Sequence, residues 1–69
     1  MKAVSGKHFC KALEKQGWVL KRTTKSSHFI YTKPGNPETL SIPVHANKDL
    51  KKGLQADLMK SAGLTADDL

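Results

Sequence analysis

The chain has 69 residues, of which 38% are apolar and 26% charged, and this length predicts one small domain spanning residues 1–69. We expect neither a second domain nor a large cofactor cleft, because a chain of this size buries only about 60% of its unfolded surface on folding. Twelve Lys and Arg against six Asp and Glu give a net charge of +6, which favours an anionic partner such as nucleic acid.

Cysteine content and apolar patterning indicate the compartment. The single cysteine, Cys10, excludes an intramolecular disulfide, which is consistent with a reducing cytosol. The first residues turn polar before a signal peptide could form, and no apolar run approaches the roughly 18 residues that a membrane span needs. We therefore expect a cytoplasmic protein that does not bind a membrane.

The first predicted element is a helix that begins after Ser5 and runs to about Gln16. Ser5 is a favoured N-cap residue, and Gly17 supplies a left-handed stop. One face carries residues at the i, i+3, i+4, i+7 spacing of a helix, namely Phe9, Ala12, Leu13 and Gln16. Because this apolar face is narrow, the helix needs a sheet to pack against.

Three strands are expected next, over residues 18–23, 27–33 and 39–44. The first two are rich in aromatic and β-branched residues and are joined by the polar residues 24–26, as in an antiparallel hairpin. Turn residues fill 34–37, and the third strand alternates apolar and polar side chains, with Pro43 near its end or on an edge. The same alternation places His28 on the face opposite Phe29 and Tyr31, so its imidazole is exposed if these aromatics pack.

A second helix is predicted over residues 50–62, where apolar residues recur about every four positions and Gly63 ends the segment. Residues 65–68 form a weak capping box for one last turn. The predicted fold is therefore α+β, in the order α-β-β-β-α, with a three-stranded antiparallel sheet and both helices on one face. The residues expected to be most buried are Leu13, Trp18, Leu40, Ile42, Leu54 and Leu58.

Three histidines are the only side chains whose usual pKa lies near neutral pH. His8 and Cys10 are two residues apart and lie on different faces of the first helix, so they do not form a metal pair. No Cys and His cluster has zinc spacing, and no metal or cofactor is expected. We interpret His8 and His45 as solvated surface residues, and the residues alone leave His28 open between an exposed strand histidine and a catalytic group.

The basic residues form two groups that could either solvate the surface or bind RNA phosphates. One group flanks His28, and the other lies at the entry to the second helix, where backbone N–H groups also attract phosphate. Asp49 opposes this attraction locally. The candidate RNA-binding residues are Lys21, Arg22, Lys25, Lys33, Lys48, Lys51 and Lys52.

Six short motifs occur in register between about Ser5 and Leu64 and together resemble the HicA-type toxins of bacterial toxin-antitoxin pairs. They are Gly17-Trp18, Ser26-Ser27-His28, Ile30-Tyr31-Thr32, Ile42-Pro43-Val44-His45, Lys48-Asp49-Leu50 and Ala62-Gly63-Leu64. The resemblance implies a fold like that of the double-stranded-RNA-binding domain and an endoribonuclease that cleaves mRNA without a metal. It also implies that His28 is the catalytic residue and that the partner is a HicB-type antitoxin, which covers the site and often binds operator DNA.

Two positions depart from the family pattern. Ser26 replaces the usual glycine before the Ser-His pair, and Phe29 replaces a second histidine that many members carry. Since glycine reaches positive φ at no cost, Ser26 could alter the hairpin backbone and reduce activity. The second proton-transfer group is also open at this stage, with water, Tyr31, a lysine and His45 as the candidates.

Two alternatives to a nuclease are a non-catalytic RNA-binding module of the same fold and a protein-interaction domain whose charge serves only solubility. A neighbouring gene that encodes an antitoxin would favour the nuclease over both.

Overall fold

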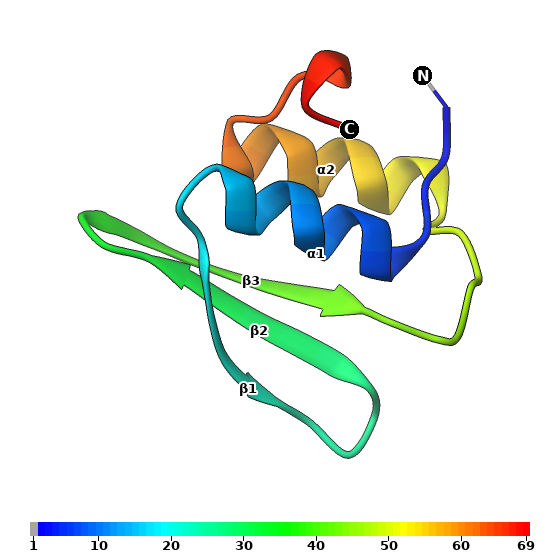
Figure 1. The fold of residues 1–69 in the computed structure, drawn as a ribbon, viewed down its shortest axis with the longest axis horizontal. Helices are drawn as coiled ribbons and strands as arrows, with labels where there is room; N and C mark the ends of the chain where they lie inside the picture. The colour runs from blue at the N-terminus through cyan, green and yellow to red at the C-terminus, as the bar shows by residue number, and fades with distance from the viewer. Residues whose placement is uncertain (1) are drawn as a thin grey trace.

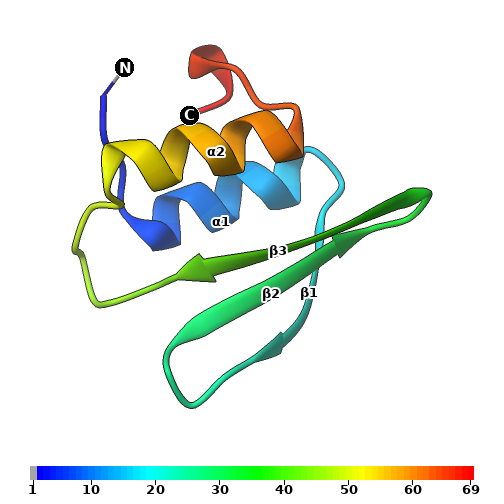
Figure 2. The same ribbon diagram turned by 180° about the vertical axis from the view of Figure 1, so that it is seen from behind.

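The computed structural model describes residues 2–69, in which two helices lie together over one face of an open sheet (Figure 1). The elements are α1 (Gly6–Lys15), β1 (Val19–Thr23), β2 (His28–Lys33), β3 (Asn36–Pro43), α2 (Lys52–Ala62) and a short 3-10 helix, η1 (Ala66–Asp68). The sheet is antiparallel in the order β1-β2-β3. The view from behind places both helices on the same side (Figure 2), so the predicted α-β-β-β-α arrangement is confirmed.

The helix ends follow local sequence signals. The Ser5 hydroxyl oxygen accepts a hydrogen bond from the His8 backbone N–H at 3.1 Å, which caps α1 as predicted. Gly17 and Gly63 follow the two helices with φ of 93° and 72°, in the left-handed region that glycine adopts without strain. The capping box over residues 65–68 is also present.

Two predicted boundaries are wrong by two or more residues, and the other ends lie within one residue of the prediction. The third strand begins at Asn36 rather than at residue 39, because Gly35, with φ of 80°, lets the chain reverse tightly and pair Asn36 with Lys33. The second helix begins at Lys52 rather than at residue 50. Lys51, the residue before the helix, is extended. Leu50 and Asp49 are held by the segment before α1, since the Leu50 N–H donates to the Val4 carbonyl oxygen at 2.8 Å and Asp49 forms a β-bridge with Ser5.

The core lies between the helices and the sheet. Its buried apolar side chains are Phe9, Cys10, Ala12, Leu13, Trp18, Tyr31, Leu40, Ile42, Leu50, Leu58, Met59 and Leu64. Five of the six residues expected in the core are there, but Leu54 is 37% exposed. Residues four positions apart on a helix are offset by about 40° around its axis, because one turn takes 3.6 residues. Leu54 is therefore displaced from Leu58 around the helix and lies at the edge of the face that buries Leu58 and Met59.

Gln55 is the one buried polar side chain among the described residues, and it is 0% exposed. Its Oε1 accepts from the Val4 N–H, and its Nε2 donates to the Lys2 carbonyl oxygen, both at 2.9 Å. Gln55 therefore fastens the segment before α1 to α2, a role that the sequence analysis did not predict.

We expect Gln55→Leu to lower the free energy of unfolding by about 1–3 kcal/mol, because it leaves a backbone donor and acceptor without partners. Urea unfolding followed by circular dichroism measures the change. Gln16→Leu is the matched control, since exposed Gln16 makes a single bond to Asp68 and its loss should cost less than about 0.5 kcal/mol. Equal effects of the two substitutions would contradict the anchoring role.

Candidate functional site

His28 is the first residue of β2 and is held by the hairpin that precedes it. The His28 carbonyl oxygen accepts from the Thr24 N–H at 2.9 Å, and the His28 N–H donates to Thr24 Oγ1 at 3.2 Å. Tyr31 is buried and Phe29 packs against the core, so strand alternation places His28 on the sheet face that the helices do not cover. Its side chain is half-buried, which limits its motion while leaving part of it accessible.

The structure brings His45 next to His28. The sequence analysis interpreted His45 as a surface residue and named it among the candidates for the second proton-transfer group, but it did not place the two histidines side by side. His28 pairs with Pro43 in the β2–β3 ladder, and the Val44 N–H donates to the Ser27 carbonyl oxygen at 2.9 Å. These contacts place the ring centroids of the two histidines 6.4 Å apart, with their planes at 84°. We refer to His28 and His45 as the histidine pair.

Two residues beside the histidine pair have positive φ although they are not glycine. Ser27, directly before His28, has φ of 63°, and Ala46, directly after His45, has φ of 52°. The turn that follows is closed by a bond from the Lys48 N–H to the His45 carbonyl oxygen at 2.9 Å. Ser26 has no positive φ, so the missing family glycine leaves no strain there, and the left-handed conformation belongs to Ser27.

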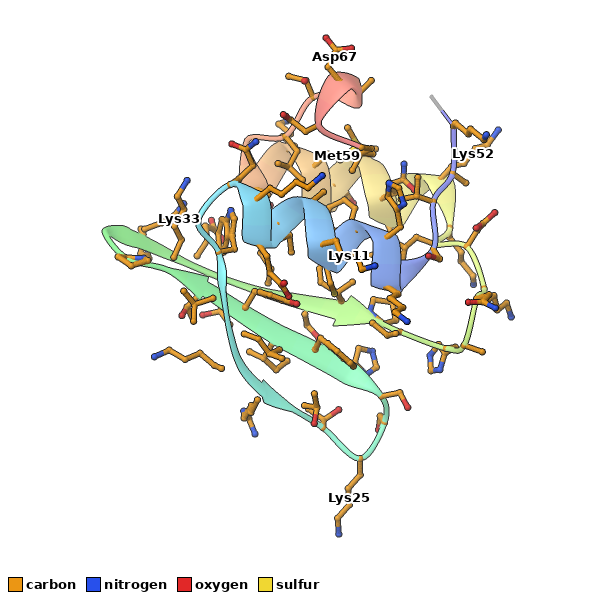
Figure 3. All side chains as sticks on the ribbon, in the orientation of Figure 1. Lys11, Lys25, Lys33, Lys52, Met59 and Asp67 are labelled. Atoms are coloured by element: carbon orange, nitrogen blue, oxygen red, sulfur yellow. The ribbon has the colours of Figure 1, made fainter. Side chains whose placement is uncertain are left out.

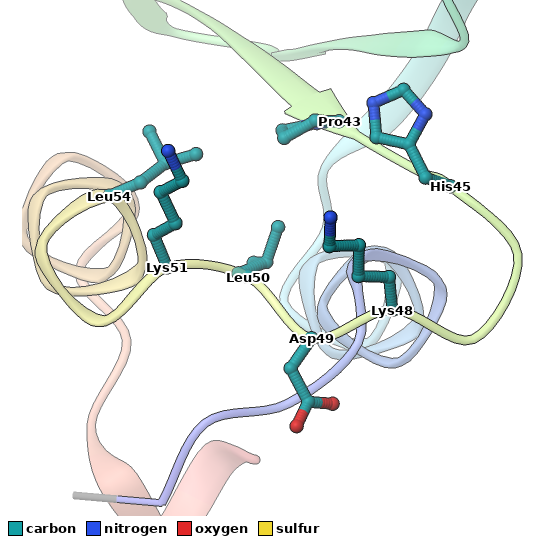
Figure 4. A pocket seen from close by; sticks show the side chains of 7 residues that line it. All are labelled: Pro43, His45, Lys48, Asp49, Leu50, Lys51 and Leu54. Atoms are coloured by element: carbon teal, nitrogen blue, oxygen red, sulfur yellow. The ribbon is translucent and has the colours of Figure 1, made fainter.

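A cavity of about 290 Å³ opens beside His45, between the end of β3 and the start of α2 (Figure 4). We call it the lysine pocket, and it is lined by Pro43, His45, Lys48, Asp49, Leu50, Lys51 and Leu54. Lys48 and Lys51 extend toward Pro43 from either side of Leu50, whereas the Asp49 carboxylate points away from them (Figure 4). The pocket therefore concentrates two positive charges on an apolar floor.

The other candidate RNA-binding residues are spread over the molecule (Figure 3). Lys25 projects from the tip of the β1–β2 hairpin, and Lys52 lies outside the lysine pocket. Arg22 pairs with Ile30 on the open sheet face, and Lys21 lies at the irregularity between Leu20 and Arg22. Lys33 is at the opposite end of β2 from His28, so the structure does not bring it to the histidine pair.

Tyr31, one of the candidates for a second proton-transfer group, lies on the helix-covered face of the sheet. It is 1% exposed, and its hydroxyl donates to Glu14 Oε2 at 2.6 Å. Burial raises the pKa of the Tyr31 hydroxyl, and the hydrogen bond to Glu14 raises it further. Burial likewise raises the pKa of the Cys10 thiol. Neither group is placed to act on a substrate at the histidine pair.

The remaining histidine, His8, is exposed on α1, and its Nε2 lies 2.7 Å from the Leu69 carbonyl oxygen. Across residues 2–69, no three His, Cys, Asp or Glu side chains gather in a way that could hold a metal ion. Over the same residues, no helix has both the length and the apolar character to cross a membrane.

Comparison with known proteins gives one finding on the family. A family model described as "HicA toxin of bacterial toxin-antitoxin" matches residues 6–64, which include both helices, all three strands and the histidine pair. No curated protein matches the chain.

Proposed function

The chain belongs to the HicA toxin family, and from this premise we propose that it is a metal-independent endoribonuclease that cleaves mRNA in the bacterial cytoplasm. His28 is its catalytic residue, and a HicB-type protein is its antitoxin. The observation that carries the proposal is the position of His28, half-buried on the open sheet face and 6.4 Å from a second imidazole.

Cleavage without a metal needs the adjacent 2′-hydroxyl of RNA as the nucleophile. As O2′ attacks phosphorus, it loses a proton, and the departing O5′ gains one. A histidine suits this exchange, because an imidazole both accepts and donates protons near neutral pH. DNA lacks the 2′-hydroxyl and is expected to resist cleavage.

The lysine pocket supplies positive charge beside the histidine pair, as phosphate binding requires. The seven basic residues named from the sequence are proposed RNA contacts, with Lys48 and Lys51 nearest to His45. Neutralising phosphates releases counterions, so RNA affinity should fall steeply as salt concentration rises.

Lys51→Ala should weaken RNA binding and lower the slope of log affinity against log salt by about 1, because it removes one phosphate contact. Lys60→Ala is the matched control, since it removes an equal charge from the last turn of α2, and Lys60 is neither a pocket residue nor one of the seven proposed RNA contacts. Fluorescence anisotropy at several salt concentrations measures both slopes. Identical losses in the two variants would mean that net charge rather than the pocket binds RNA.

Growth of a bacterial host tests the toxin assignment. Expression of the chain alone should slow growth, and expression together with its neighbouring antitoxin gene should restore growth. In the antitoxin complex, we expect the partner to cover His28 and part of the basic surface. Normal growth during expression of the folded chain would instead favour a non-catalytic RNA-binding module or an attenuated toxin.

A further inference from the structure

We propose that His45 is the second proton-transfer group of the site and acts on the same phosphodiester as His28. The proposal rests on the proposed ribonuclease function and adds a second catalytic residue to it.

The separation of the two rings suits a shared substrate. Proton transfer requires each catalytic nitrogen to lie about 2.6–3.2 Å from the oxygen that it serves. With centroids 6.4 Å apart, the rings are too distant for a direct hydrogen bond but close enough for one phosphate group lying over the pair to contact both. Each imidazole can then reach a different oxygen of that phosphate.

The backbone fixes this separation. Ser27 and Val44 immediately precede the two histidines, and the hydrogen bond between their backbones ties the start of β2 to the residues after β3. The turn closed by Lys48 N–H and the His45 carbonyl oxygen holds the other side of His45. Such placement lowers the entropic cost of bringing two catalytic groups to one bond.

Among the described residues, the titratable side chains around His45 are charged groups and the single imidazole of His28. His28 faces it from β2, Lys48 and Asp49 come from the connecting loop, and Lys51 comes from the start of α2. Tyr31 lies on the other face of the sheet and donates to Glu14. Within residues 2–69, His45 therefore carries the imidazole nearest to His28.

The two histidines take complementary roles in one transesterification. One neutral imidazole accepts the 2′-hydroxyl proton as the bond from O2′ to phosphorus forms. The other, as imidazolium, gives a proton to O5′ as the bond from phosphorus to O5′ breaks. The products are a 2′,3′-cyclic phosphate and a 5′-hydroxyl, and proton exchange with water restores both rings.

Single-turnover cleavage of one RNA substrate across pH 5–9 tests this role. The wild-type rate should rise and then fall with pH, as expected for an acid and a base acting together. His45→Ala and His45→Gln should each lower the rate by about 10²-fold to 10⁴-fold and remove one limb of the profile. RNA affinity and melting temperature should stay near wild type, because exposed His45 is not part of the core.

His8→Ala is the matched control, since it removes an exposed histidine from another part of the fold and should keep both limbs. A second test uses a substrate with sulfur in place of the leaving O5′. The sulfur leaves without being protonated, so this substrate does not need the general acid. It should therefore restore much of the rate in the variant that lacks the acid, which is only one of His28→Ala and His45→Ala.

If His45→Ala keeps both limbs, or if the sulfur substrate acts equally on both variants, the role proposed for His45 is wrong. A slow His28→Ala beside a fast His45→Ala would reject only this inference. A fast His28→Ala would reject the proposed function itself.

Discussion

Replacing His28 with Ala should lower the rate of RNA cleavage by about 10²-fold to 10⁴-fold, the range that positioned acid-base groups contribute. The loss should appear in the chemical step, since His28 is proposed to move a proton rather than to bind a phosphate. RNA affinity should therefore change little, and the fold should survive, because the half-buried imidazole is not part of the core.

Single-turnover rates and dissociation constants measured on one RNA separate these two effects. His8→Ala serves as the control for loss of a histidine elsewhere on the surface. Cleavage by His28→Ala at the wild-type rate would remove His28 from the mechanism. Equal loss of rate and affinity would instead indicate a binding role.

The largest effect on stability is expected from Gly6→Ala. A Cβ added at Gly6 would overlap the Pro43 carbonyl oxygen and lie 3.1 Å from Val44 Cα. Both neighbours are backbone atoms, so the start of α1 and the end of β3 would have to separate. We expect a loss at or above the upper end of the roughly 1–3 kcal/mol seen for overpacking.

Gly53→Ala is the matched control for Gly6→Ala. Gly53 lies in the first turn of α2, and an added Cβ would meet nothing within 4 Å. Alanine is the better helix former, so this variant should gain up to about 1 kcal/mol. Thermal unfolding should therefore move the two variants in opposite directions. A Gly6→Ala protein as stable as wild type would show that the close approach is not rigid.

The Gly6→Ala variant also connects stability to the site. Pro43 and Val44 precede His45, so separating them from α1 should move His45 relative to His28. We expect this variant to cleave RNA more slowly even at temperatures where it remains folded.

The order of elements could be predicted because its signals are local. Ser5, Gly17 and Gly63 mark helix ends through the conformations and hydrogen bonds of single residues. Strand alternation likewise placed Phe29 and Tyr31 on the packed face of β2 and His28 on the other.

The parts that could not be predicted depend on contacts between distant segments. Gln55 is buried because its amide meets backbone groups of residues 2 and 4, which no local pattern reveals. Leu54, which was expected in the core, lines the lysine pocket. The nearness of His45 to His28 follows from the register that pairs His28 with Pro43, and register is not fixed by the composition of either strand.

The sequence motifs nevertheless contained both members of the histidine pair, in Ser26-Ser27-His28 and Ile42-Pro43-Val44-His45. In an antiparallel hairpin, the start of the first strand lies beside the end of the second, and this arrangement brings His28 and His45 together. The turn residues over 34–37 already indicated that hairpin. The pairing of His28 with Pro43, however, depends on the start of β3 at Asn36, which the sequence analysis did not predict.

One measurement tests the central claim most directly: the products of RNA cleavage by the wild-type protein in excess EDTA, analysed by mass spectrometry. The account predicts undiminished cleavage, with 2′,3′-cyclic phosphate and 5′-hydroxyl ends, and no cleavage of DNA of the same sequence. Loss of activity on chelation, or products that carry a 5′-phosphate, would contradict nucleophilic attack by the 2′-hydroxyl with proton transfer by His28.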